Sequence, residues 1–110
     1  MTERFILTPQ AQQDLTDIAE FIAKESGLAA AERVVRELER NFQLLAEQPE
    51  VGHGREDITA DPAVRFWAVY SYLVAFVSSD RPLAVVSVIH GARDPAGIRT
   101  HLEQAGDASE

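Results

Sequence analysis

Residues 64–89 read VRFWAVYSYLVAFVSSDRPLAVVSVI, and this stretch decides the fold. It holds three apolar runs, at residues 64–70, 72–77 and 83–89, that are rich in Val, Ile and aromatic side chains. Such residues favour strands, and the polar breaks between the runs suit turns, so the stretch predicts three consecutive strands of an antiparallel sheet. The second and third runs are apolar on both alternating faces. This is typical of interior strands covered on both sides, or on one side and by a partner.

A helix is predicted before this stretch. Thr8 and Pro9 suit its first positions, because Thr caps free N–H groups and Pro needs no helical hydrogen bond there. Apolar side chains then recur at helical spacing and define one buried face: Ala11, Leu15, Ile18 and Ile22. The acids of this helix are predicted on its other, solvated side: Asp14, Asp17 and Glu20.

Ser26 and Gly27 end this helix, and a second helix follows from Leu28 until Pro49 stops it. Its apolar side chains also keep helical spacing: Leu28, Ala31, Val35, Leu38, Phe42 and Leu45. Because a turn of only about two residues joins the helices, they are predicted to form an antiparallel hairpin.

Residues 4–7 predict a short first strand, and residues 95–102 predict a final helix capped by Asp94. The order is β-αα-βββ-α, an α+β fold in which the helical hairpin packs on an antiparallel sheet. We expect one domain at residues 1–104 and a flexible tail at 105–110. The predicted core comprises Leu15, Ile18, Ile22, Val35, Leu38, Phe42, Phe66, Val74, Phe76, Val86 and Val88.

The composition is that of a folded chain without cysteine chemistry. Of the 110 residues, 45% are apolar and 25% are charged, which favours a packed core over disorder. The absence of Cys excludes disulfides, a thiol nucleophile and thiolate metal sites. No apolar run approaches the roughly 18 residues of a membrane span, and the N-terminus does not resemble a signal peptide, so we expect a cytoplasmic protein with no membrane partner.

No cofactor or metal is expected. The histidines, His53, His90 and His101, lack the paired spacing of metal ligands. No glycine-rich phosphate loop precedes a helix, and no Ser lies in a nucleophile elbow.

The charge is unevenly distributed along the chain. A net charge of −8 argues against a general polyphosphate binder. Residues 64–99, however, carry four Arg and two acids and are locally positive. In the strand that begins at residue 64, alternation can direct Val64, Phe66 and Ala68 to the helices. Arg65 and Trp67 would then share the opposite face, as a partner-binding pair unless the final helix covers Trp67.

Several short segments, taken in order, resemble one family. They are Thr8-Pro9-Gln10-Ala11 with Asp14-Leu15 and Ile18, Phe21-Ile22-Ala23, Leu45-Ala46 with Pro49 and Gly52, Arg65 with Val69, and Val88-Ile89-His90-Gly91-Ala92-Arg93-Asp94. They span residues 5 to about 95 and resemble the ParE branch of the RelE/ParE toxins of type II toxin–antitoxin systems. The His-Gly-Ala-Arg-Asp segment after an apolar strand is the most distinctive.

The resemblance implies a small toxin that inhibits growth by poisoning DNA gyrase and is neutralised by a cognate ParD-like antitoxin. The free toxin is not expected to bind nucleic acid sequence-specifically. We expect the target to contact the locally basic C-terminal part, through Arg65, His90, Arg93 and Arg99. We expect the antitoxin to contact the helical hairpin, through Phe21, Arg33, Arg36 and Arg40.

The RelE branch implies an alternative, a ribosome-dependent endoribonuclease that cuts messenger RNA. Arg65 would supply the cation, His90 the acid, and Glu47 or Glu50 the base. The chain holds few further groups of this kind, and His90 can equally serve as a structural hydrogen-bonding residue. A third alternative is an inactive member that persists as an antitoxin-binding protein.

Overall fold

A computed structural model describes residues 4–78, 82–91 and 94–108. The order of elements is the one predicted, with a short 3-10 helix, η1, added after the hairpin. The elements are β1 (Phe5–Leu7), α1 (Pro9–Ser26), α2 (Leu28–Glu47), η1 (Pro49–Val51), β2 (Val64–Val69), β3 (Tyr72–Val77), β4 (Leu83–His90) and α3 (Pro95–Ala108).

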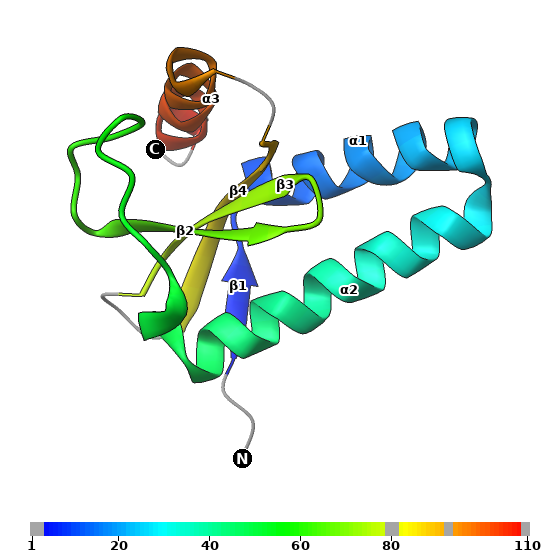
Figure 1. Cartoon of the computed structure of the whole chain (residues 1–110), viewed down its shortest axis with the longest axis horizontal. Coiled ribbons are helices and arrows are strands. Elements are labelled where there is room, and N and C mark those ends of the chain that lie inside the picture. Colours follow the sequence, from blue (N-terminus) through cyan, green and yellow to red (C-terminus); the bar gives the residue numbers. More distant parts are fainter. Residues whose placement is uncertain (1–3, 79–81, 92–93, 109–110) are drawn as a thin grey trace.

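The strands form one sheet in the order β1-β4-β3-β2 (Figure 1). The three strands of residues 64–90 pair antiparallel, as predicted, and the strands with two apolar faces, β3 and β4, lie in its interior. β1 adds to the free edge of β4 in parallel, with Phe5 opposite Leu83 and Leu7 opposite Val85. The sheet is therefore mixed rather than wholly antiparallel.

The helical hairpin turns at Gly27, whose φ of 97° lies in the region that favours glycine. Its N–H donates to the Ala23 carbonyl at the end of α1, and its own carbonyl accepts the Ala31 N–H in α2. At the other end of α1, the Thr8 hydroxyl accepts the Ala11 N–H, which confirms the predicted cap. Figure 1 shows the hairpin tip projecting beyond the sheet.

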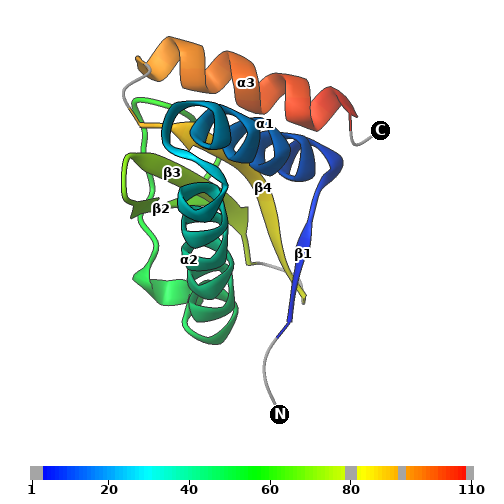
Figure 2. The same ribbon diagram turned by 90° about the vertical axis from the view of Figure 1, so that its right-hand side faces the viewer.

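The two faces of the sheet bury separate clusters. The hairpin covers one face, where Leu38, Phe42 and Leu45 of α2 meet Val74, Phe76, Val85 and Val88 of β3 and β4. On the other face, Ile98 of α3 packs with Ile58, Phe66, Ala75 and Ile89. α3 also runs alongside α1 (Figure 2). Within the described ranges, no helix is both long and apolar enough to cross a bilayer.

Most of the predicted core is buried, with five exceptions. Six of its side chains are buried: Leu38, Phe42, Phe66, Val74, Phe76 and Val88. The remaining five are only half-buried: Leu15, Ile18, Ile22, Val35 and Val86. Ile22 and Val35 are not part of the cluster that the hairpin buries against the sheet, and Val35 lines the groove between the two helices. Val86 has no partner on β3, because Ala75 pairs with Ser87 and Phe76 with Val85, so it is the extra residue of a bulge.

The final helix begins as predicted and ends later. The Asp94 carboxylate accepts the Gly97 N–H, which confirms the predicted cap. α3 then continues beyond Leu102 to Ala108, into the residues for which the sequence predicted a tail.

Candidate functional site

A buried carboxylate joins the three elements around the end of β4. Asp14 of α1 is 5% exposed, and its oxygens accept four hydrogen bonds. Oδ2 accepts the Ser87 hydroxyl at 2.6 Å and the Val88 N–H at 2.9 Å, both from β4. Oδ1 accepts the Gln10 amide at 2.8 Å and lies 2.9 Å from Nε2 of His101 in α3. Asp14 therefore ties α1, β4 and α3 together.

The solvated position predicted for Asp14 is wrong. Asp14 lies three residues after Ala11 and four before Ile18, so helical geometry places it on the apolar stripe itself. This spacing in the sequence could have predicted that Asp14 is buried. The Ser87 and Val88 donors that make burial possible are more than seventy residues away in the chain.

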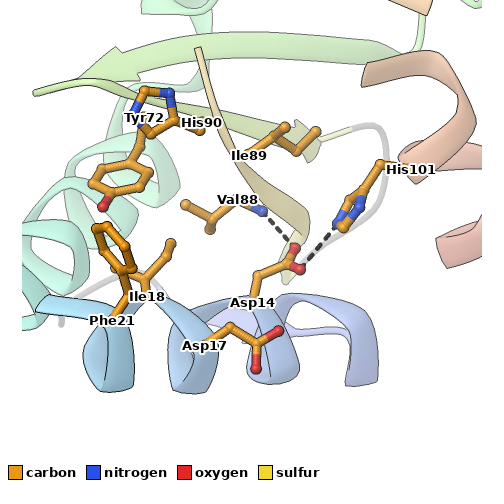
Figure 3. Close-up of a pocket in the computed structure, with 9 residues that line it drawn as sticks. All are labelled: Asp14, Asp17, Ile18, Phe21, Tyr72, Val88, Ile89, His90 and His101. Carbon is orange, nitrogen blue, oxygen red and sulfur yellow. Dashed lines mark hydrogen bonds and ion pairs between the residues drawn. The ribbon is translucent and has the colours of Figure 1, made fainter. Parts of the chain in front are cut away.

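A pocket of about 360 Å³ opens beside Asp14 (Figure 3). One wall is a stripe of α1, and the ends of β3 and β4 form the rest together with His101. Phe21 and Tyr72 lie at one end of the pocket, and Asp14 and His101 lie at the other (Figure 3). The Tyr72 and His90 rings meet edge to face, with centroids 5.5 Å apart. The lining residues are Asp14, Asp17, Ile18, Phe21, Tyr72, Val88, Ile89, His90 and His101.

A second hollow lies at the β2–β3 turn. Tyr70 adopts a φ of 54° there and is 65% exposed, and His90 and Arg55 line the same hollow. Arg55 donates through Nε and Nη2 to both carboxylate oxygens of Asp57. This hydrogen-bonded pair lowers the pKa of Asp57 and raises the pKa of Arg55. The guanidinium therefore stays charged and is oriented within its loop.

Arg65 and Trp67 were predicted on the face of the sheet turned away from the helices. That prediction is wrong, because they lie on the face that the hairpin covers. Phe66 packs in the α3 cluster, whereas Trp67 packs on the hairpin cluster and donates its indole N–H to Asn41 of α2 at 2.9 Å. The Arg65 guanidinium donates to the Gly52 carbonyl. Alternation correctly separated the two sets of side chains, but it could not show which helix layer covers which set.

Two other residues predicted to bind the target, His90 and Arg99, lie apart from Arg65. Arg99 of α3 donates to the carbonyls of Ile58 at 2.7 Å and Asp57 at 3.1 Å, so it fastens the loop before β2. His90 ends β4 and is exposed. Arg93 lies outside the described residues.

The residues predicted to bind the antitoxin lie on the hairpin. Phe21 is 62% exposed on α1. Arg33, Arg36 and Arg40 are exposed at helical spacing along α2, and Arg40 contacts Glu37 at 3.0 Å. Arg36 also lines a groove of about 450 Å³ between the two helices.

The proposed nuclease set is not assembled. Arg65 lies opposite Phe76 on β3, and four residues away on that strand Tyr72 lies opposite His90. At about 3.3 Å per residue along the strands, and with two strand spacings of about 4.8 Å, the backbones of Arg65 and His90 are about 16 Å apart. Glu47 and Glu50, at the end of α2 and in η1, lie on the Arg65 side of this gap. Among the residues that the structure describes, no three His, Asp or Glu side chains gather as metal ligands.

Comparison with known proteins identifies the family. A model described as the ParE toxin of the type II toxin–antitoxin system parDE matches residues 5–95. The chain belongs to this ParE toxin family.

Individual ParE proteins agree with this assignment. The chain is 28% identical over 95 residues to "Toxin ParE1" from two Mycobacterium tuberculosis strains, CDC 1551 / Oshkosh and H37Rv. Each alignment covers 86% of this chain and 95% of the relative. A solved structure titled "Chromosomal ParDE TA system from P. aeruginosa" has the same fold, with a TM-score of 0.68 and 18% identity, over 81% of this chain and 96% of the other. The ParE match ends where α3 begins, so Arg99 and His101 lie beyond it.

Proposed function

We propose that this ParE-family toxin inhibits growth by binding and poisoning DNA gyrase, without covalent chemistry of its own, and that a ParD-like antitoxin neutralises it. The observation that carries the proposal is the family match across residues 5–95. The gap of about 16 Å along the sheet between Arg65 and His90 also favours a binding toxin over a ribonuclease, because acid and cation must meet at one phosphate.

The hollow at the β2–β3 turn is the proposed centre of the target-binding surface. It combines a His with an exposed Tyr and a charged Arg, and Tyr and Arg are enriched where proteins bind one another tightly. We propose that Arg93, which is three residues after His90 in the sequence, also contributes to the target-binding surface. Arg65 and Arg99 are proposed to support this surface, since their guanidinium groups already bind carbonyl groups of the loop.

The hairpin is the proposed antitoxin-binding surface. Its exposed Phe21 offers an apolar anchor, and Arg33, Arg36 and Arg40 offer cations for carboxylates of the partner. A segment of the antitoxin that folds as a helix on this surface would bury both kinds of side chain.

The test has two arms, purified protein with gyrase and supercoiled plasmid, and purified protein with translating ribosomes. We expect gyrase to lose supercoiling activity or to be trapped on cleaved DNA. Arg93→Ala should weaken this effect roughly tenfold, as expected when a charged contact is lost. The matched control is Arg4→Ala, because Arg4 is exposed and lies outside both proposed surfaces.

His90→Ala distinguishes the alternatives. For a binding toxin, we expect a partial loss of gyrase poisoning and no cleavage of messenger RNA. Codon-positioned cuts that disappear in His90→Ala would instead assign the ribonuclease activity and overturn the proposal.

A further inference from the structure

The pocket beside Asp14 shares Phe21 with the proposed antitoxin surface and His90 with the proposed target surface, but neither surface explains its two carboxylates. Asp17, Ile18 and Phe21 project from α1 at helical spacing and form one wall. The apolar ring of Phe21 lines this pocket and is 62% exposed. Such a ring is placed to contact a side chain that enters the pocket.

The pocket is built for positive charge. Among the described residues, its lining includes the carboxylates of Asp14 and Asp17, the Phe21, Tyr72 and His90 rings and the His101 ring that contacts Asp14, and no Lys or Arg. Asp14 already accepts four hydrogen bonds, so its charge acts at a distance. Asp17 is exposed on the wall, with Oδ1 accepting the Gln13 amide on the helix surface, so it is the carboxylate within reach of a ligand. Aromatic faces and a carboxylate together favour a cation.

We propose that this pocket binds an Arg side chain of the antitoxin, which makes the inference depend on the proposed function. A guanidinium stacks flat on an aromatic ring and pairs with a carboxylate, whereas an ammonium is a compact, strongly hydrated charge. The methylene stem of the Arg would lie against Ile18 and Val88, which also line the pocket.

The position of the pocket supports a protein ligand rather than a free cation. Phe21 stands on the hairpin helix that is proposed to receive the antitoxin. Because Phe21 lines the pocket, a segment lying along α1 would bring a side chain to the pocket while it covers Phe21. The acidic lining of the pocket complements a basic residue, just as the Arg residues of α2 complement acidic ones.

The chemistry of the pocket can be tested without the antitoxin. N-acetyl-arginine methylamide would be titrated into the labelled protein, with NMR of the Phe21 and Tyr72 rings and the Asp17 amide. Matched titrations would use the citrulline and norleucine analogues. We expect millimolar binding of the arginine probe and at least tenfold weaker effects of the other two. Equal effects of citrulline or norleucine, or no effect of arginine at these residues, would overturn the proposal.

The second arm measures affinity for the proposed ParD-like antitoxin, which we would seek in the gene next to that of this chain. Asp17→Asn keeps the Oδ1 acceptor and the side-chain shape but removes the charge, so we expect roughly tenfold weaker binding. Phe21→Leu should also weaken binding. The control is Glu25→Gln, which removes the same charge from an exposed position of α1 outside the pocket.

The two failures can be told apart. Unchanged affinity of Asp17→Asn for a neighbour that does bind would refute the arginine pocket and leave the antitoxin assignment standing. If the candidate antitoxin does not bind the protein at all, the antitoxin assignment fails, together with the proposal that an antitoxin Arg enters the pocket. The arginine probe then decides whether the pocket itself recognises a guanidinium.

Discussion

Asp14 accepts a backbone hydrogen bond from the part of β4 that β1 does not pair with. β1 covers β4 only as far as Val85, and from Thr8 onward the chain is turning into a helix. Thr8 donates its N–H to the Val85 carbonyl and its hydroxyl to the Val86 carbonyl, and Asp14 then accepts the Val88 N–H. The backbone and hydroxyl of Thr8 and the carboxylate of Asp14 therefore make hydrogen bonds that another strand would have made.

Removing this acceptor should be costly. Asp14→Ala leaves the Ser87 hydroxyl and the Val88 N–H without their acceptor inside the protein, and we expect a loss of about 3 kcal/mol in the free energy of unfolding. Urea unfolding followed by the fluorescence of Trp67 measures this change. Asp17→Asn, at an exposed position of the same helix, should change stability by less than about 0.5 kcal/mol. Similar values for the two variants would contradict the structural role of Asp14.

The Arg55–Asp57 pair predicts a local effect of pH. The hydrogen bonds from Arg55 hold the pKa of Asp57 below its ordinary value. The pair therefore stabilises the folded protein at pH values above the ordinary Asp pKa of about 3.9. Its contribution is lost as the pH falls through the lowered value. A carboxyl NMR titration should show the Asp57 midpoint moving upward in Arg55→Gln. An unchanged midpoint would mean that the contact does not persist in solution.

At the level of elements, periodicity and capping residues predicted nearly every helix and strand. The ends of α1 and the start of α2 followed from Thr8, Pro9 and Gly27, because these residues have strong local preferences. The faces of the strands were harder to predict. A period of two separates two faces without showing which layer covers each, and the bulge at Val86 changes the alternation within β4.

The centre of α2 should carry much of the stability of the hairpin. Leu38 is fully buried against the sheet, so Leu38→Ala should cost about 2–5 kcal/mol in the free energy of unfolding. Leu28→Ala is the matched comparison on the same helix. Leu28 is 69% exposed at the hairpin tip, so we expect a change below about 0.5 kcal/mol. A small effect at Leu38 would show that this helix is not packed on the sheet as described.

At the scale of the whole molecule, three layers enclose two separate cores, and the pocket beside Asp14 opens where the layers meet. The sequence could not predict this site, because Asp14, Tyr72, His90 and His101 come from four different elements. Of the predicted site residues, Phe21 and His90 contribute to the pocket, whereas Arg65 and Arg99 bind carbonyl groups elsewhere.

Removing α3 should uncover the second core. A chain ending after Asp94 loses Ile98 and Leu102 and exposes Phe66, Ala75 and Ile89. Loss of the two apolar side chains alone predicts a destabilisation of about 3–6 kcal/mol, with increased binding of an apolar dye. A chain ending after Glu103 keeps both side chains and is the control. Equal stability of the two truncated chains would contradict the packing of α3.

The parallel pairing of β1 with β4 also determines when the protein can fold during its synthesis. Leu7 and its partner Val85 are separated by roughly 80 residues, and a ribosome that adds about 5–20 residues per second takes roughly 4–16 s to synthesise the chain between them. Until then, the nascent hairpin can bury its apolar face only against β2 and β3, without β4 and the β1 strand that pairs with it. Translation itself therefore delays the appearance of a folded toxin until β4 has been synthesised.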